Sequence, residues 1–147
     1  MFHARKLFRD KIKQYLEPLN LKAIYIDKPV YLEYADCPVL YITTESETIN
    51  TNNIGYPRIG QRVLTFSLSL YLKTQEDLTD KMDEYCYEIE NAFSLSKDRV
   101  KFDNLALSSQ IVNIDFSFDE TQDREVAKIV YTLEIMYNLR ENSLDGI

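Results

Sequence analysis

The sequence predicts one α+β domain in which an antiparallel or mixed β-sheet carries two main helices on one of its faces. Three observations predict this fold. Two stretches repeat apolar residues three or four positions apart, as one buried face of a helix requires. Several others alternate apolar and polar residues, as strands with one buried face do. The chain of 147 residues has the length of one ordinary domain, and we expect residues 1–147 to form it.

The first segment is predicted to be a helix that ends at Pro18, because a proline disfavours helical geometry in the residue before it. Its apolar side chains form one stripe: Phe2, Leu7, Phe8, Ile12, Tyr15, Leu16 and Leu19. Its opposite face is basic: Arg5, Lys6, Arg9, Lys11 and Lys13.

Strands are expected over residues 22–27, 39–49 and 62–73, with Pro29 and Pro38 interrupting the chain between the first two. The third strand alternates most regularly. One side carries Leu64, Phe66, Leu68, Leu70 and Leu72, and the other carries Thr65, Ser67, Ser69 and Tyr71.

A second helix is predicted over residues 74–93, with Thr74 or Thr79 as its cap. Its apolar stripe is Leu78, Met82, Tyr85, Ile89 and Phe93. The exposed side is strongly acidic, and residues 94–104 are expected to be a connector.

The last segment is predicted to be a β-hairpin with a polar turn at 119–125, followed by a mobile tail at about 139–147. Its first strand is expected to place Val112, Ile114, Phe116 and Phe118 on one face. Its second strand does the same with Ile129, Tyr131, Leu133, Ile135 and Tyr137.

The net charge of −7 argues against a protein that binds nucleic acid or anionic membranes through a basic surface. Cys37 and Cys86 do not have the spacing of a metal site, and we expect two unpaired thiols in a reducing cytosol. No signal peptide and no apolar run of about 20 residues is present, which predicts an intracellular protein without a membrane segment.

No motif of an enzyme or a nucleotide-binding loop occurs, so we expect no catalytic residue, metal or cofactor. His3 is the only histidine, and it is not expected to have a role. Asp115 and Asp119 fall on the polar side of one strand, and Glu134 could lie opposite them. A divalent-cation site and a simply hydrated strand face both remain open, and the second is favoured because no clustered ligand set accompanies these residues.

Residues 50–62 hold two of the three glycines and one of the four prolines. Asparagine and glycine tolerate left-handed and extended conformations, so this segment is expected to be a flexible loop. Asn52, Tyr56, Arg58 and Arg62 supply amide, aromatic and guanidinium groups for contacts. Two interpretations remain: an assembly loop that projects toward a partner, and a plain hairpin connection.

The two helices carry opposite charges. Arg5, Lys6, Arg9 and Lys13 lie on the first helix. Asp80, Glu84 and Glu88 lie on the second. These faces either meet water, where they contribute little, or meet each other between neighbouring subunits and fix their orientation.

The order of these elements resembles the tail terminator proteins of tailed bacteriophages, also called minor tail protein U-like or tail-completion proteins. The resemblance rests on "RKLFRDKIKQYL", "PVLYITTESETI", "RVLTFSLSLYL", "EIENAF" and the closing pair "IDFSFDE" and "VYTLEIMYNL". It spans roughly residues 5–138.

The resemblance implies a subunit of a homo-hexameric ring at the head-proximal end of the tail tube. Such a ring ends tube polymerisation and joins the tail to the head, so the implied partners are the tail tube protein and a head-completion or connector protein. The polar sheet face, with Asp115, Asp119 and Glu134, would line a channel through which DNA passes without specific binding. The protein would occur in the host cytoplasm during assembly and in the virion tail or neck.

A second hypothesis is a small α+β module that senses a ligand or binds a peptide. Such a module would hold a pocket between sheet and helices with convergent polar groups. The sequence does not identify those groups. A measured mass discriminates between the two hypotheses, because a ring former gives a hexamer and a regulatory module more often a dimer.

Overall fold

The computed structural model describes residues 3–27, 37–51, 55, 58–73, 77–121 and 124–140. Along these ranges the elements are α1 (Ala4–Leu16), β1 (Ala23–Ile26), β2 (Val39–Thr51), β3 (Ile59–Lys73), α2 (Leu78–Ser94), α3 (Lys97–Val100), β4 (Ser108–Thr121) and β5 (Arg124–Arg140). Most of the tail predicted at 139–147 lies outside the described residues.

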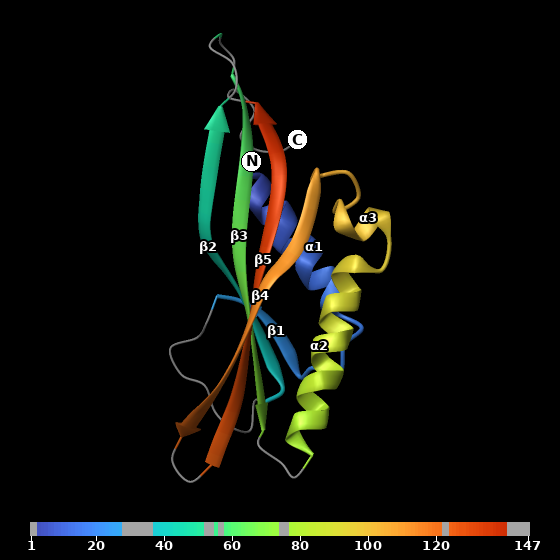
Figure 1. Ribbon diagram of the computed structural model, residues 1–147, viewed down its shortest axis with the longest axis vertical. Coiled ribbons are helices and arrows are strands. Elements are labelled where there is room, and N and C mark those ends of the chain that lie inside the picture. The colour runs from blue at the N-terminus through green and yellow to red at the C-terminus, as the bar shows by residue number, and fades with distance from the viewer. Residues whose placement is uncertain are drawn as a thin grey trace.

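The strands form one five-stranded sheet in the order β1-β2-β3-β5-β4. β1 runs parallel to β2, and the remaining neighbours are antiparallel. The sheet is therefore mixed, and both long helices pack on one side of it (Figure 1). The predicted α+β class is confirmed.

The core lies between the sheet and the two helices. The predicted alternation of β3 is confirmed, since Leu64, Phe66, Leu68, Leu70 and Leu72 are all buried. The same holds for β5: its predicted inner side chains are buried, namely Ile129, Tyr131, Leu133, Ile135 and Tyr137. Burying such side chains is the main favourable contribution to folding, at about 1.5–3 kcal/mol for each large one.

Aromatic rings join α1 to the rest of the core. The ring of Phe8 meets the rings of Phe102 and Tyr137 edge-on, with centroids 5.7 and 4.9 Å away. Tyr15 lies about two helical turns after Phe8 on the same face of α1. Its ring centroid is 5.3 Å from that of Phe102 and 6.3 Å from that of Phe93. α1 ends at Leu16, just before Pro18, as the proline predicts.

Two irregularities change which side chains face the helices. In β4 the register shifts between Ile111 and Asn113, so Val112 is the extra residue of a β-bulge. The predicted inner face of this strand is wrong at this point. Ile111 packs against the core together with Ile114, whereas Val112 is exposed.

A second bulge lies in β2, where the register shifts between Thr44 and Ser46 and leaves Glu45 as the extra residue. Leu40 and Ile42 face the helices before this bulge. After it, Glu47 lies opposite Leu64 and therefore takes the helix-covered side. A strand without the bulge would direct Glu47 to the other side.

α2 begins later than predicted, and Asp77 occupies its cap position without a side-chain hydrogen bond. Thr79 lies inside the helix, and Thr74 lies outside the described residues. Tyr85 is half-buried, and Cys86 is the buried residue in that turn. The predicted connector contains α3, whose cap Ser96 accepts a hydrogen bond from the Arg99 amide.

The sheet side without helices is called the open face here. A small apolar cluster covers one end of it: Cys37, Val39, Tyr41, Tyr71 and Val126. Tyr71 does lie on the predicted polar side of β3, but it is 1% exposed. The ring of Tyr25 stacks on Tyr41 at 5.6 Å. The rest of the open face carries polar side chains together with Val63, Val130 and Met136, and the ammonium group of Lys128 lies over the ring of Tyr71.

Candidate functional site

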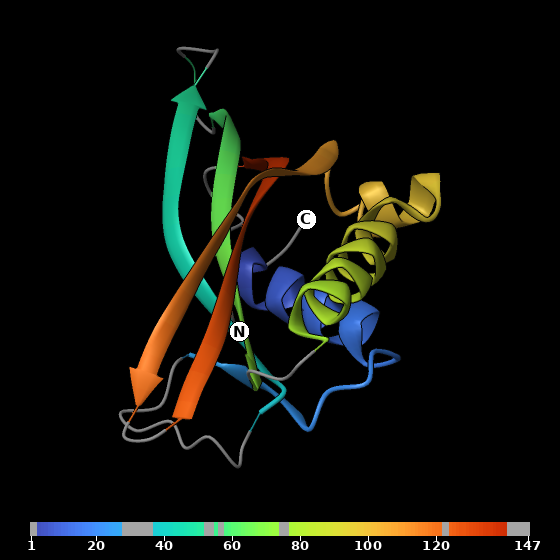
Figure 2. The same cartoon turned by 60° about the horizontal axis from the view of Figure 1, so that its bottom comes forward.

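The open face brings together hydroxyl, amide and carboxylate side chains from three neighbouring strands. Its exposed or half-buried members are Thr65, Ser67 and Ser69 of β3, Thr132 and Glu134 of β5, and Asn113, Asp115 and Ser117 of β4. No helix of the described chain covers these strands on this side in Figures 1 and 2. The surface offers hydrogen bonds and negative charge over a broad sheet.

The structure places the predicted acidic residues at separate points of the open face. Asp115 lies opposite Val130 and accepts a hydrogen bond of 2.8 Å from the side-chain amide of Asn113. Glu134 lies between Thr65 and Gln110, so the expectation that it sits opposite Asp115 is wrong. The backbone of Asp119 pairs with Val126, and its side chain lies outside the described residues.

A charged cluster that the sequence analysis did not predict lies on the other side of the sheet, beneath α1. The carboxylate of Glu47 is paired with the guanidinium groups of Arg5 and Arg62, and the hydroxyl of Tyr137 donates to it. The Arg62 Nη1 to Glu47 Oε1 distance is 3.3 Å, and the Glu47 side chain is 9% exposed. This cluster joins α1, β2, β3 and β5.

The environment of Glu47 stabilises its ionised form. Desolvation alone would raise the pKa of this carboxyl, but the hydrogen bonds from Tyr137 and Arg5 and the charge of Arg62 outweigh it. The net result is a lowered pKa for Glu47. Burial and the hydrogen bond to Glu47 raise the pKa of Tyr137, which therefore stays protonated and remains a donor.

His3 has a structural role that was not predicted. Its Nδ1 accepts a hydrogen bond of 3.2 Å from the Arg5 amide and caps the N-terminus of α1. Partial burial, and then the charge of Arg5, lower the pKa of His3. A neutral imidazole is the form that can accept this bond.

The assembly loop predicted over 50–62 is shorter than expected, because β2 continues to Thr51 and β3 begins at Ile59. Asn52 and Tyr56 lie outside the described residues. Arg58 is exposed next to β3. Arg62 lies inside β3, and its guanidinium forms an ion pair with the Glu47 carboxylate. Of the four predicted loop residues, the structure thus describes Arg58 and Arg62, and the assembly role stays a prediction.

The basic residues of α1 make several contacts within the chain. Arg5 pairs with Glu47, and Lys6 pairs with Asp10 one turn along at 3.0 Å. Arg9 lies 3.5 Å from the hydroxyl of Thr44, while Lys13 is exposed. Lys11 forms an ion pair of 2.7 Å with Asp103. The basic face is thus partly engaged inside one subunit.

The acidic face of α2 is directed to solvent. Its exposed acidic residues are Asp77, Asp80, Asp83, Glu84, Glu88 and Glu90. Lys81 lies 3.7 Å from Glu84. Tyr87 stands among these carboxylates and is 71% exposed. This face presents negative charge and one aromatic ring to the surroundings.

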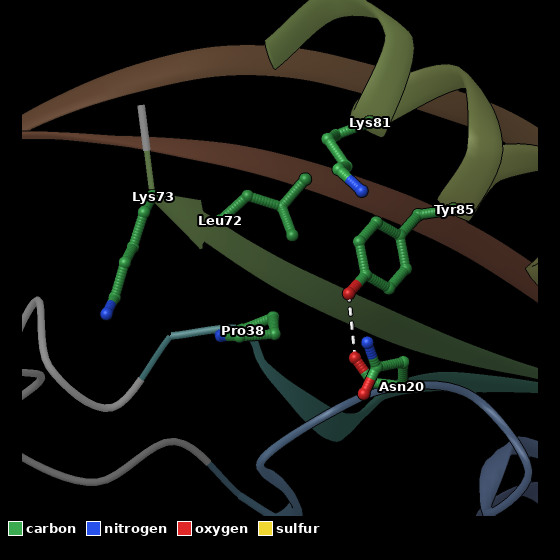
Figure 3. Close-up of a pocket in the computed structure, with 6 residues that line it drawn as sticks. All are labelled: Asn20, Pro38, Leu72, Lys73, Lys81 and Tyr85. Atoms are coloured by element: carbon green, nitrogen blue, oxygen red, sulfur yellow. Dashed lines mark hydrogen bonds between the residues drawn. The ribbon is translucent and has the colours of Figure 1, made fainter. Parts of the chain in front are cut away.

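A pocket of about 300 Å³ lies between the start of α2, the end of β3 and the segment that follows α1. Its lining residues are Asn20, Pro38, Leu72, Lys73, Lys81 and Tyr85. The Tyr85 hydroxyl donates to the Asn20 carbonyl at 2.7 Å and closes one side (Figure 3). In the same view the Lys81 ammonium points toward Tyr85, while that of Lys73 points away.

Cys37 and Cys86 are both buried, and neither forms a disulfide. Tyr131 donates a hydrogen bond of 3.3 Å to the Cys86 sulfur, and burial raises the pKa of this thiol. Among the described residues, no three His, Cys, Asp or Glu side chains lie together as metal ligands would. No helix in the described ranges is long and apolar enough to span a membrane.

Comparison with known proteins adds little to this geometry. No protein-family model matches the chain. No curated protein matches its sequence either. Among solved structures, a chain described as "Virion of native gene transfer agent (GTA) particle" is similar at 13% identity and a TM-score of 0.44, covering 85% of this chain and 91% of that one. This likeness is too distant to carry an argument about function.

Proposed function

We propose that this chain is a structural subunit of a phage-like virion and acts as a tail terminator. In this role it forms a ring at the head-proximal end of the tail tube, ends polymerisation of the tube and connects tail to head. The proposal starts from the resemblance of the order of elements to that family. The arrangement of the surface supports it.

The open face is the observation that carries this proposal. It leaves hydroxyl and amide groups with the carboxylates of Asp115 and Glu134 on a broad sheet without a covering helix. A channel wall of this chemistry would repel the phosphates of passing DNA. The negative charge of the whole chain has the same effect. The ammonium group of Lys128, which is also on this face, lies over the ring of Tyr71 at the end of the sheet that carries the apolar cluster.

Ring closure by one kind of subunit requires two different complementary patches on each copy. The acidic face of α2 supplies one, since Asp80, Glu84 and Glu88 are exposed. The second patch is the basic face of α1, where Lys13 is exposed and Arg9 is half-buried. Because Arg5 is already paired with Glu47 within the subunit, we take Lys13 as the main basic contact between subunits.

Native mass spectrometry and negative-stain microscopy of the purified chain test the proposal. We expect rings of six copies, either alone or after addition of a cognate tail tube protein, and tubes that stop growing at the ring. The Arg58→Ala variant isolates the loop contact, because Arg62 also supports the fold. A chain that stays monomeric with and without tube protein, and leaves tube length unchanged, contradicts the proposal.

The pocket beside Tyr85 favours the alternative of a ligand-sensing module. Its volume lies at the lower end of the range for small-molecule sites, and Lys81 would suit an anionic group. A thermal-shift screen of small carboxylates and phosphates tests this alternative. Stabilisation that disappears in Lys81→Ala, together with a dimeric or monomeric mass, would favour the module over the ring.

A further inference from the structure

β4 is an outer strand of the sheet with β5 as its neighbour. The edge of β4 away from β5 is called the β4 edge here. In an antiparallel strand, every second residue directs its N–H and C=O away from the paired neighbour, so an outer strand presents a row of backbone donors and acceptors. β4 has 14 residues, which leaves a long edge of this kind. Its later half runs away from α2 in Figures 1 and 2.

The side chains of this later half differ on its two sides. Phe116 lies opposite the buried Ile129 on the helix side of the sheet, yet it is 54% exposed. Asp115 lies on the open face and is exposed. The strand therefore offers an apolar surface on one side and a carboxylate on the other, one residue apart.

The charges along the sheet edges disfavour pairing between two copies of this chain. β4 contains no lysine, arginine or proline, the residues that commonly block an exposed edge. Its ionisable residues are Asp115, Asp119 and Glu120. Among the described residues, residues 43–51 of β2 pair with β3 on one side and extend past β1, and they carry Glu45 and Glu47. In a second copy, β1, residues 43–51 of β2 and β4 all lack a basic residue that could face Asp115. Pairing of β4 with β4 would also bring acidic residues together, which destabilises cross-strand pairs.

We propose that the β4 edge is a docking site for an extended, basic segment of another protein, which adds to the sheet as a sixth strand. Successive side chains of a strand point to opposite sides, so the segment's own pattern follows from β4. Basic residues would face Asp115 on the open face. Apolar residues would lie beside Phe116 on the helix side. The partner is a segment in which lysine or arginine alternates with apolar residues.

The test uses the full chain and a fluorescein-labelled eight-residue peptide of alternating lysine and valine. We expect saturable binding by anisotropy that weakens as salt is raised. Amide hydrogen exchange should show new protection at residues 113–117. The Asp115→Lys variant should bind at least tenfold more weakly. A second variant, Phe116→Ser, keeps the charge of the strand and should also weaken binding.

The matched control is Asp98→Lys, which makes the same charge change at an exposed position of α3 outside the proposed subunit contact and should keep full affinity. Equal losses in Asp98→Lys and Asp115→Lys would show that the peptide binds by general charge attraction, and would overturn the proposal. Absence of protection at 113–117 would do so as well. A glutamate–valine peptide of the same length should not bind. Protection that grows with protein concentration without peptide would assign the edge to a second copy, also against the proposal.

Discussion

Glu47 of β2 and Arg62 of β3 are joined by an ion pair of 3.3 Å on the helix-covered side of the sheet, where most neighbouring side chains are apolar. Arg5 and Tyr137 also donate hydrogen bonds to the Glu47 carboxylate. A buried charge whose partners are removed is costly, so this pair should dominate the response of the fold to substitution.

Glu47→Gln should destabilise the chain by about 3 kcal/mol, because it leaves two guanidinium groups without their carboxylate. Urea unfolding followed by circular dichroism measures the change. Glu45→Gln is the matched control, since Glu45 is the exposed bulge residue two positions away and should change stability by less than about 0.5 kcal/mol. Equal losses of unfolding free energy in the two variants would contradict the stabilising role assigned to the Glu47 ion pairs.

The stability of the chain should fall on acidification because of the same residue. The folded-state pKa of Glu47 lies below its usual value, so its ionised form contributes stability that is fully present above the unfolded pKa. That contribution is lost as the pH falls through the folded pKa. The difference in unfolding free energy between native chain and Glu47→Gln should therefore be constant near pH 7 and shrink below about pH 4. A difference that stays constant down to pH 2 would contradict this assignment.

Deletion of Glu45 should leave the fold intact. Ser46 and Glu47 would keep their positions opposite Thr65 and Leu64, and β2 would become a regular strand. We expect a change of no more than about 1 kcal/mol. Deletion of Ser67 in the middle of β3 is the contrast, because it turns one half of the leucine series to the open face and should prevent folding. Amide-resolved spectra of both variants distinguish the outcomes.

Charge reversal should control assembly if the ring proposal holds. Glu88→Lys should abolish hexamers in native mass spectra, and Asp98→Lys on α3 should not, although both alter one exposed acid. The double variant Glu88→Lys with Lys13→Glu should restore assembly by exchanging the two signs. Hexamers that persist in Glu88→Lys would place the subunit contact elsewhere.

The sequence predicts those parts of the fold that repeat regularly. The alternation from Leu64 to Leu72 and from Ile129 to Tyr137 requires one buried side, and the structure buries it. The two bulges were not predicted, because a bulge is defined by the pairing of a strand with its neighbour. In β2 the sequence signal for the bulge is that the apolar residues change from even to odd positions: Leu40 and Ile42 are even, whereas Ile49 is odd. In β4 the spacing of three between Ile111 and Ile114 is the same signal.

The site was less predictable than the core for a related reason. In the sequence, nothing distinguishes Glu47 from the other polar residues of a half-exposed strand. Only the bulge directs its side chain toward Arg5 and Arg62. The sequence prediction places Arg62 where the loop 50–62 meets the strand 62–73, yet strand pairing extends further back, through Gly60 to Ile59. The proposed channel, loop and inter-subunit roles depend on other molecules, which no pattern within one chain encodes.

The aromatic core makes this chain convenient to observe by optical methods. Tyr131, Tyr137, Tyr71 and Tyr41 are almost fully buried, and the sequence contains no tryptophan to mask their emission. A single tryptophan introduced in place of Phe116 would thus be the sole indole in the molecule. Its emission wavelength would report directly whether water or a bound strand surrounds that position.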